Sequence, residues 1–236
     1  RTHRAAPSLK RGALHDPSHP AIQNALDFGA VRVGGAAAAP DWFKAWGWQP
    51  DGDALCNDEL SCCCPVADFR LIQGWKAAAG ELWTVPKELV RLRYAQVAGW
   101  TGMPETDQGT TPAVDCFDWQ VSPIVTDDIE WHVRWCTVRP EDVRSALRRG
   151  PIQLTIGLTP DDADDPWLWD DDAEGQFAEF HRVVCGAQRS GALICRTYGF
   201  DVPVASSRIV AADLLLNVNM PADLRTAGLD WNAVLA

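Results

Sequence analysis

The sequence predicts an α+β protein, with helices in the first half of the chain and an antiparallel sheet in the second. In the first half apolar residues recur at helical spacing, as Val66, Phe69 and Ile72 do. In the second half apolar and polar residues alternate, as they do from Ile129 to Trp135, which is typical of a half-buried strand. Helices that precede the strands, rather than alternating with them, indicate the α+β class.

The first 40 residues predict an extended arm. They are rich in proline, glycine and alanine, include the pair Gly34-Gly35, and show no sustained apolar period. A dense group of aromatic side chains then begins at Trp42, and such density is typical of a core. We therefore expect an arm over residues 1–40 and one domain over residues 41–236. The arm either wraps the domain, reaches a partner or is a disordered tail.

Three helices are expected after the aromatic group. A proline in the first turn marks a helix at residues 64–79. Thr84 is the expected N-cap of a second helix, which ends before Gly99. The third helix is expected at residues 111–120, and a short amphipathic helix at residues 140–149. The expected strands are residues 129–135, 152–158, 182–187, 192–198 and 214–218, the last of them at an edge of the sheet.

The charge of the chain disfavours two classes of partner, and its hydropathy predicts no membrane span. The formal net charge is −11, which disfavours a nucleic-acid or anionic-membrane surface, since both need clustered Lys and Arg. No run approaches the roughly 18 apolar residues that span a bilayer, and no signal-peptide pattern is present, so a cytosolic origin is expected. The acidic run at residues 161–172 lacks the ligand spacing of a calcium loop and is expected to be a solvated loop.

Three consecutive thiols, Cys62, Cys63 and Cys64, stand at the start of the first predicted helix. Partial positive charge at a helix N-terminus favours a thiolate, the nucleophilic form of cysteine. Adjacent cysteines do not resemble a disulfide framework in a chain of this size, so most of the eight cysteines are expected to be free thiols. Zinc is the weaker alternative because no second Cys or His pair accompanies the trio, and no cofactor is expected.

A thiol hydrolase also needs a histidine from elsewhere in the chain as its base. His132 alternates on one predicted strand, while His181 begins a strand of the predicted hairpin. His181 is the better candidate because a histidine entering a central strand can face a cysteine on a buried helix. The alternative to a general base is that His181 is a hydrogen-bonded core histidine. The alternative to a nucleophile is that Cys63 is an inert packing thiol.

The order of several short motifs resembles the papain-like cysteine peptidase fold. These motifs are Asn57-Asp58 six positions before Cys63, Thr106-Asp107-Gln108-Gly109, Gly150-Pro151, the strand of His181, and Thr197-Tyr198-Gly199. The chain is similar, more narrowly, to papain-like proteins encoded by bacteriophages and prophages, whose motif reads Asn-Asp-x-x-Gly-Asp-Cys. The resemblance covers residues 40–235. It implies Cys63 as nucleophile, His181 as general base and Asn57 as side-chain oxyanion donor.

The chain also departs from the family pattern. Ser61-Cys62 replaces the Gly-Asp that precedes the nucleophile, and Glu179-Phe180 replaces a Gly-Gly pair. Arg196 takes the position of the asparagine that would orient the histidine. An arginine has only donors and stays cationic, so beside His181 it would disfavour imidazolium. These departures predict a degenerate Cys-His site.

The resemblance and the departures together predict a phage-type virion protein on a papain-like fold, either capsid-associated or a decoration protein. Its expected partners are capsid or other virion subunits, contacted through residues 1–40, with no nucleic acid and no membrane. Its expected locations are the phage particle and, during assembly, the bacterial cytoplasm. The alternative is an active papain-like peptidase or amidase, and a thiolate metal site is a third possibility.

Overall fold

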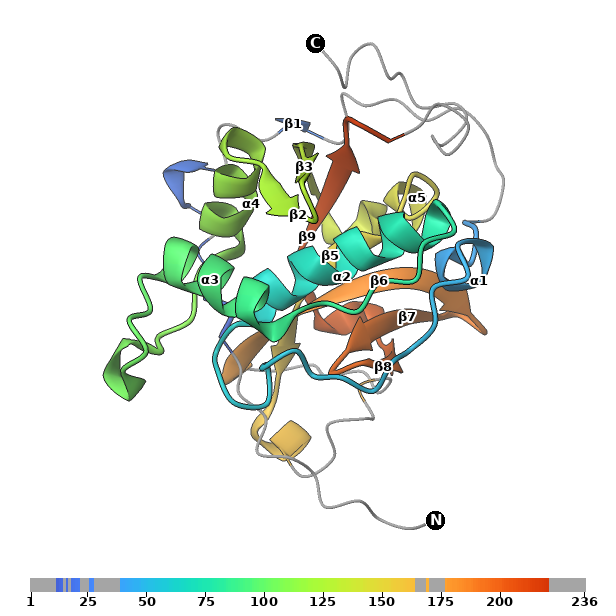
Figure 1. Cartoon of the computed structure of the whole chain (residues 1–236). Helices are drawn as coiled ribbons and strands as arrows, with labels where there is room; N and C mark the ends of the chain where they lie inside the picture. Colours follow the sequence, from blue (N-terminus) through green and yellow to red (C-terminus); the bar gives the residue numbers. More distant parts are fainter. Residues whose placement is uncertain are drawn as a thin grey trace.

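A seven-stranded sheet with helices packed against it forms the centre of the computed structural model (Figure 1). The described residues are 12–14, 16, 18–21, 26–27, 39–163, 169 and 177–220. The helices are α1 (Trp42–Ala45), α2 (Cys63–Ala78), α3 (Lys87–Ala98), α4 (Pro112–Val121) and α5 (Val143–Ala146), with 3-10 turns η3 (Pro104–Thr106), η4 (Pro140–Asp142), η5 (Pro160–Ala163) and η6 (Ser206–Arg208). The strands are β1 (Leu26–Asp27), β2 (Ile124–Thr126), β3 (Ile129–Trp131), β4 (Val133–Val138), β5 (Ile152–Leu158), β6 (Glu179–Arg189), β7 (Ala192–Thr197), β8 (Phe200–Val204) and β9 (Ile209–Asn217). The predicted α+β class is confirmed.

The strand order of the large sheet is β1-β4-β9-β5-β6-β7-β8, and β2 and β3 form a separate hairpin. Neighbouring strands are antiparallel except β1 and β4. Strand β9 lies in the middle of the sheet, so the edge strand expected at residues 214–218 was wrong. Leu214, Leu215 and Leu216 are all buried, because β9 is covered on both faces. An unbroken apolar run is typical of such a strand.

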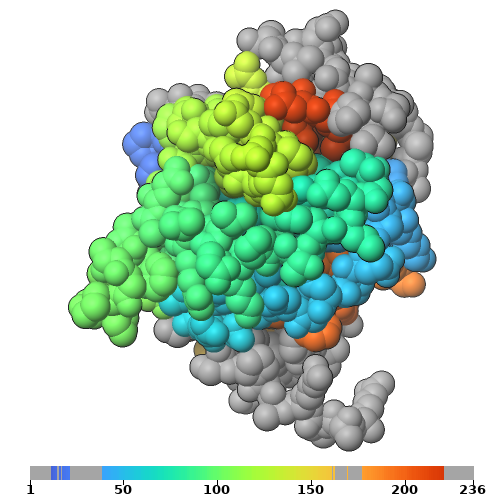
Figure 2. Space-filling model, viewed as in Figure 1, coloured from blue at the N-terminus to red at the C-terminus, as the bar shows by residue number. Residues whose placement is uncertain are grey.

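Helix α2 starts at Cys63, one residue before its predicted start, and every residue from Cys63 to Lys76 is buried. It packs on β6 and contacts α3 and α4. Figure 1 shows α2 crossing in front of the sheet, and Figure 2 shows the helical half covering most of the sheet on that face. The N-terminus of α2 therefore lies in the interior, between the sheet and two helices.

A glycine marks the C-terminus of α3 and a threonine caps the N-terminus of α4, but the predicted cap at the start of α3 is absent. Helix α3 is followed by Gly99, whose left-handed φ of 68° suits glycine at a helix C-terminus. Helix α4 follows Thr111, whose hydroxyl accepts the N–H of Val114 at 3.2 Å. Thr84 does not cap α3, because the helix starts at Lys87 with Pro86 at the N-cap position.

Two elements of the second half are shorter than predicted. The helix expected at residues 140–149 is the turn η4 followed by the single-turn α5. The strand expected at residues 129–135 breaks at His132, which separates β3 from β4. Strand β5 has its predicted bounds, but all of its residues are buried. Its polar face is buried as well because it bonds to aspartate and arginine side chains of the interior.

The predicted hairpin is present as β6 and β7. Ser190 and Gly191 join the strands, and both have positive φ, 50° and 87°, as a tight two-residue hairpin turn requires. His181 lies near the start of β6, and Thr197 is the last residue of β7. Because antiparallel strands bring these two ends together, the hairpin places Thr197 beside His181.

The predicted arm over residues 1–40 lies mostly outside the described residues. Its described parts contact the domain: Ala13 forms a parallel bridge with Thr110, and Leu26–Asp27 pairs with β4. Most of the acidic run at residues 161–172 also lies outside the described part. Among the helices that are described, none is long and apolar enough to cross a membrane.

Candidate active site

Cys63 is the first residue of α2, and Cys62 is the N-cap. Cys62 makes no side-chain capping bond, and the first N–H groups of a helix have no partner within the helix. These N–H groups and the positive end of the helix dipole favour an anion at this position. The start of α2 therefore favours the thiolate form of Cys63.

Cys63 differs from its two neighbours in the direction of its pKa shift. Burial raises the pKa of Cys63, but hydrogen bonds from Cys64 and His181, together with the charge of His181, hold that pKa well below the usual thiol value. The backbone N–H of Arg182 also bonds the sulfur. Burial raises the pKa of Cys62, and the bond to Cys63 raises that of Cys64. Of the three thiols, Cys63 alone has a lowered pKa.

The imidazole of His181 is fully buried and is contacted by three side chains. Its Nε2 atom lies 2.7 Å from the Oγ1 atom of Thr197. The ring of Tyr198 stacks on it, with centroids 5.1 Å apart, and Trp169 packs against its edge at 5.8 Å. Thr197 engages Nε2, and Nδ1 has no hydrogen-bond partner among the described residues, so Nδ1 is the ring nitrogen free to serve Cys63. These contacts orient the ring.

Arg196 does not take the place beside His181 that the sequence analysis gave it. Its guanidinium pairs with Asp201 at 2.8 Å and donates to the carbonyl of Trp48 at 3.1 Å. It also lies over the rings of Phe43 and Trp48. Successive side chains of a strand point to opposite faces, so it is Thr197 that faces the histidine. The expected destabilisation of imidazolium by Arg196 therefore has no basis in this geometry.

Asn57 is fully buried, and neither atom of its side-chain amide has a hydrogen-bond partner among the described residues. It follows a tight turn in which Leu55 and Cys56 have φ of 53° and 72°, and its N–H donates to the carbonyl of Ala54 at 3.0 Å. Left-handed φ at non-glycine residues costs about 1–3 kcal/mol each and is concentrated at functional sites. Asn57 thus offers an unused donor six positions before Cys63, on a strained turn.

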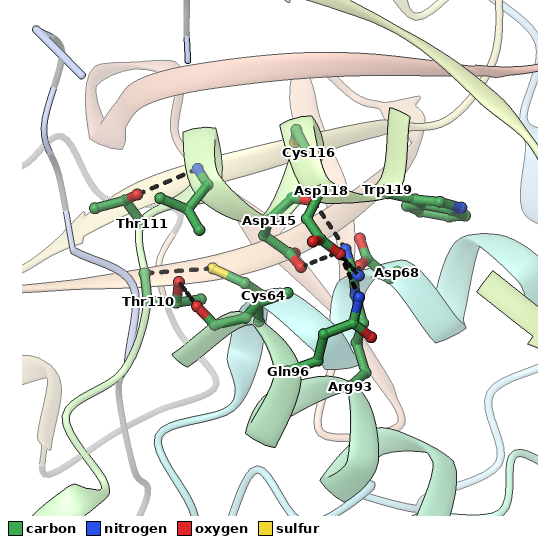
Figure 3. Close-up of polar contacts among 12 residues, drawn as sticks. Cys64, Asp68, Arg93, Gln96, Thr110, Thr111, Asp115, Cys116, Asp118 and Trp119 are labelled. Atoms are coloured by element: carbon green, nitrogen blue, oxygen red, sulfur yellow. Dashed lines mark hydrogen bonds and ion pairs between the residues drawn. The ribbon is translucent and has the colours of Figure 1, made fainter. Parts of the chain in front are cut away.

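A buried acidic network supports α2 behind the cysteines (Figure 3). Arg93 pairs with Asp115 at 3.0 Å and also with Asp118, and Gln153 donates to Asp68 at 2.9 Å. Burial, and then the charge of Asp115, raises the pKa of Asp68 well above its usual value. Asp115 and Asp68 shift each other's pKa, which shows that the two carboxyl groups interact. Burial raises the pKa of Asp115 as well, and Arg93 lies 3.5 Å from Asp68, so the two buried carboxyl groups share one arginine.

The loop that ends at Thr110 is tied to the cysteine segment. Asp107 accepts the N–H of Ser61 at 2.8 Å and the hydroxyl of Tyr94 at 2.7 Å. The Tyr94 oxygen in turn accepts the N–H of Gly109 at 3.0 Å. Because Tyr94 is fully buried, these bonds fix the separation of Ser61 and Gly109. Cys64 of α2 also contacts this loop, because its sulfur lies 3.7 Å from the carbonyl oxygen of Thr110 (Figure 3).

A narrow space, which we call the slot, lies between Ser61 and the loop that ends at Thr110. Residues Gly12–Leu14 occupy this slot. The two ends of this segment exchange main-chain hydrogen bonds of 2.9 Å with Thr110. Ala13, between them, is buried against Cys63 and its neighbour Cys64. The chain therefore covers its own candidate nucleophile with a short extended segment.

A cavity of about 210 Å³ lies beside residues that follow the two paired segments in the chain. Its lining includes Asp16, which follows the slot segment, and Pro112, which follows the loop. Trp135 and Val210 contribute apolar surface, while Asp213 adds a carboxylate that is ion-paired to a buried arginine.

The neighbours of His181, which are Thr197, Tyr198 and Trp169, were not predicted from the sequence. Strand alternation on β7 was the signal that could have identified Thr197 in place of Arg196. All eight cysteines are free thiols. Within the described ranges, no group of three or more His, Cys, Asp or Glu side chains could hold a metal ion.

Comparisons with known proteins identify the fold. No family model and no curated protein matches the sequence. A solved structure of proCathepsin B S9 from Trypanosoma congolense matches with a TM-score of 0.56 and 10% identity, over 88% of this chain and 86% of that one. A structure from work on antibody cross-reactivity between the mite allergens Blo t 1 and Der p 1 matches with a TM-score of 0.53 and 9% identity, over 87% and 75%. Both are papain-like cysteine peptidases, and at such identities the likeness shows the papain-like fold alone.

Proposed function

We propose that this chain is a papain-like thiol hydrolase that cleaves an amide or ester bond through an acyl-enzyme on Cys63. One observation carries the proposal: His181, whose ring Thr197 holds, lowers the pKa of the buried Cys63 well below its usual value. Burial, the largest cause, raises the pKa of Cys116 of α4, which is the direction expected of a packing thiol.

In the first step the Cys63 thiolate attacks the substrate carbonyl carbon, and a carbon–sulfur bond forms while the carbonyl π electrons move to oxygen. We assign two donors to the oxyanion, the N–H of Cys63 at the helix start and the side-chain amide of Asn57, which has no partner among the described residues. The tetrahedral intermediate collapses as the bond to the leaving amine or alcohol breaks. Nδ1 of imidazolium His181 supplies the proton that this group takes.

In the second step water hydrolyses the acyl-enzyme. Neutral His181 takes a proton from the water, and the resulting hydroxide attacks the thioester carbonyl. The carbon–sulfur bond then breaks, releasing a carboxylic acid and restoring the Cys63 thiolate with imidazolium His181. In this scheme Nε2–H donates to the hydroxyl oxygen of Thr197, so that Nδ1 serves as the proton-transfer atom in both steps.

Acetylation by p-nitrophenyl acetate tests the proposal. The native chain and the Ala13→Trp variant, whose larger side chain does not fit over Cys63, are each reacted and digested for mass spectrometry. We expect acetyl-Cys63 at neutral pH, formed at least about 100-fold more slowly after His181→Ala, since a positioned acid–base contributes at least that factor. The matched control is His132→Ala, because His132 is an exposed histidine paired with Glu130. Absence of acetyl-Cys63 in both chains, or indifference to His181→Ala, would refute the hydrolase.

A non-catalytic role on the same fold is the second candidate. The observation that favours it is the full burial of Cys63 beneath Ala13, which suits a thiol that never meets a substrate. In this form the chain would be a capsid-associated or decoration protein of a phage particle, present in the bacterial cytoplasm during assembly. Residues 1–40 would contact the virion subunits.

The test of the second candidate is co-sedimentation of the purified chain with phage capsids. The sequence places Arg1, Arg4, Lys10 and Arg11 in the arm. Reversing these four charges to Glu should weaken co-sedimentation if the arm binds the capsid. The anchoring role is refuted if the charge-reversed variant co-sediments as well as the native chain, or if the native chain does not co-sediment. This conclusion holds whether or not Cys63 is reactive.

A further inference from the structure

We propose that the slot recognises an extended peptide strand in which glycine is followed by a small residue, and that Gly12–Ala13 is the chain's own occupant. This inference rests on the proposed function, because it names the substrate class of the same site. It is carried by the fit of three consecutive residues, Gly12, Ala13 and Leu14, each of which meets a different surface.

The first position accepts only glycine. A Cβ atom on Gly12 would overlap the main-chain carbonyl of Ser61, which is backbone and cannot rotate away. On the other side of the segment, a Cβ atom on Gly109 would overlap the carbonyl of Gly12, and Gly109 has a left-handed φ of 77°. Two glycines thus allow the segment and the loop to approach closely in front of Ser61.

The walls of the slot are held at this separation. Asp107 bonds both Ser61 and Tyr94, and Tyr94 bonds Gly109, so that one carboxylate and one phenol connect the two sides. Burial, followed by the bond to Asp107, raises the pKa of Tyr94, which therefore remains a neutral donor. A side chain at the first position cannot be accommodated by widening the slot without breaking these bonds.

The second position accepts a small residue. Ala13 is 5% exposed and packs on Cys63 and Cys64, with Phe180 at the side. Cys63 and Cys64 belong to the buried start of α2, and α2 is itself packed between the sheet and two helices. A larger side chain at this position would have to displace the helix start or leave the slot.

The third position is open, and the affinity comes from the main chain. Leu14 is 49% exposed, so its side chain is not selected. Its N–H donates to the carbonyl of Thr110, and the N–H of Thr110 donates to the carbonyl of Gly12, both at 2.9 Å. Main-chain pairing of an added strand supplies binding that is independent of sequence, and the neighbouring surfaces supply selectivity. The ligand class is therefore an extended peptide with glycine and then a small residue.

The experiment measures the rate of Cys63 alkylation by iodoacetamide in the full chain, read by mass spectrometry. In the Gly12→Val variant residues 12–14 of the chain cannot enter the slot. We expect alkylation of Cys63 to be at least about tenfold faster, because the loss of two main-chain hydrogen bonds corresponds to about that factor. The acetylated, amidated peptide Arg-Gly-Ala-Leu, which copies residues 11–14, should restore protection. The same peptide with valine in place of glycine should not. Ser18→Val, an exposed change in the same part of the chain, is the control.

Three results would overturn the proposal: Gly12→Val alkylated no faster than the native chain, equal protection by both peptides, or protection by neither. Thermal unfolding of Gly12→Val checks that the variant folds. Ala13→Trp is the second variant should Gly12→Val not fold, and the same three outcomes apply to it. Because alkylation and protection need no turnover, a chain that discriminates between the peptides but forms no acetyl-Cys63 refutes the hydrolase alone. A chain that forms acetyl-Cys63 without discriminating refutes the slot alone.

Discussion

The ring of Tyr198 lies parallel to the imidazole of His181, with centroids 5.1 Å apart and planes inclined by 6°. Tyr198 reaches this position from the turn after β7, where it has a left-handed φ of 48° and is followed by Gly199 at 77°. Such a backbone is strained for tyrosine, so the stacking is held by the surrounding structure. The same turn aims the hydroxyl of Thr197 at Nε2, and one short segment therefore supplies two of the contacts that orient the ring.

Thr197→Val tests whether this hydroxyl orients His181. Valine keeps the shape and removes the bond to Nε2, and the net value of a hydrogen bond, about 1–1.5 kcal/mol, corresponds to a loss of about tenfold. We expect acetylation of Cys63 to slow by about that factor while thermal stability changes little. Thr197→Ser, which retains the hydroxyl, should restore the rate. Equal rates for the valine and serine variants would show that the bond has no role in orientation.

The alkylation rate of Cys63 should depend on pH in the direction that its pKa shift sets. Burial opposes ionisation, but the bonds from Cys64 and His181 outweigh it, so the pKa is lowered and the thiolate persists as the pH falls below the range of an ordinary thiol. With iodoacetamide and the opened Gly12→Val chain, the rate should stay level from about pH 9 to neutrality and fall only at lower pH, whereas an ordinary thiol loses reactivity below about 8.5.

Cys64→Ala supplies the matched test of that profile. Removing the Cys64 thiol deletes the first of the two bonds that lower the pKa of Cys63, so the fall in alkylation rate should move to higher pH. Cys136→Ala, a buried thiol on β4, should leave the profile unchanged. A profile that titrates as an ordinary thiol in every variant would contradict the assignment of Cys63 as a thiolate.

Arg196→Met should affect stability rather than the site. The guanidinium is buried, pairs with Asp201 and lies over two aromatic rings, and removal of one partner of a buried pair costs about 3–5 kcal/mol. Chemical denaturation should show a loss of about 3 kcal/mol, since Asp201 is partly exposed, and Asp201→Asn in the same chain should recover part of it. Acetylation of Cys63 should keep its rate and pH profile. A slower rate with unchanged stability would return Arg196 to the site.

Asp68→Asn should stabilise the fold at neutral and higher pH. The folded-state pKa of Asp68 is raised, so its contribution to stability is complete below the unfolded-state value of about 4 and is lost as pH rises through the raised pKa. Asparagine can keep the bond from Gln153 at every pH, and it removes a carboxyl group whose ionisation burial opposes. We expect thermal unfolding to show a gain of about 1–3 kcal/mol that grows with pH. Asp128→Asn, at an exposed turn, is the control, and an equal gain there would remove the explanation.

The sequence was sufficient to locate Cys63 and His181, because a helix start and a strand start are local patterns and both are where the spacing predicts. The partner of His181 was not predictable by alignment with a motif. Arg196 and Thr197 are adjacent on β7 and point to opposite faces, and a shift of one residue exchanges the face that meets the histidine. The slot could not be predicted either, since the fit of Gly12 against Ser61 joins segments that are distant in sequence.

Most helices and strands were predicted, but their neighbours in the sheet were not. Hydrophobic period sets the type of an element, whereas strand order depends on which non-local pairings bury most surface. The run Leu214–Leu216 was the local sign that β9 is central, because an edge strand seldom needs three consecutive apolar residues. The bounds of α5 and the break at His132 depend on packing rather than on local preference.

The position of β9 between β4 and β5 has a consequence for folding during translation. β4 has no main-chain pairing with β5, and β9 joins the two. Translation at about 5–20 residues per second therefore leaves two incomplete half-sheets exposed until residue 217 has emerged. During that interval the open edges of β4 and β5 are templates for pairing with other nascent chains. A chaperone that shields these edges should raise the yield of native protein more than one that binds the helical half.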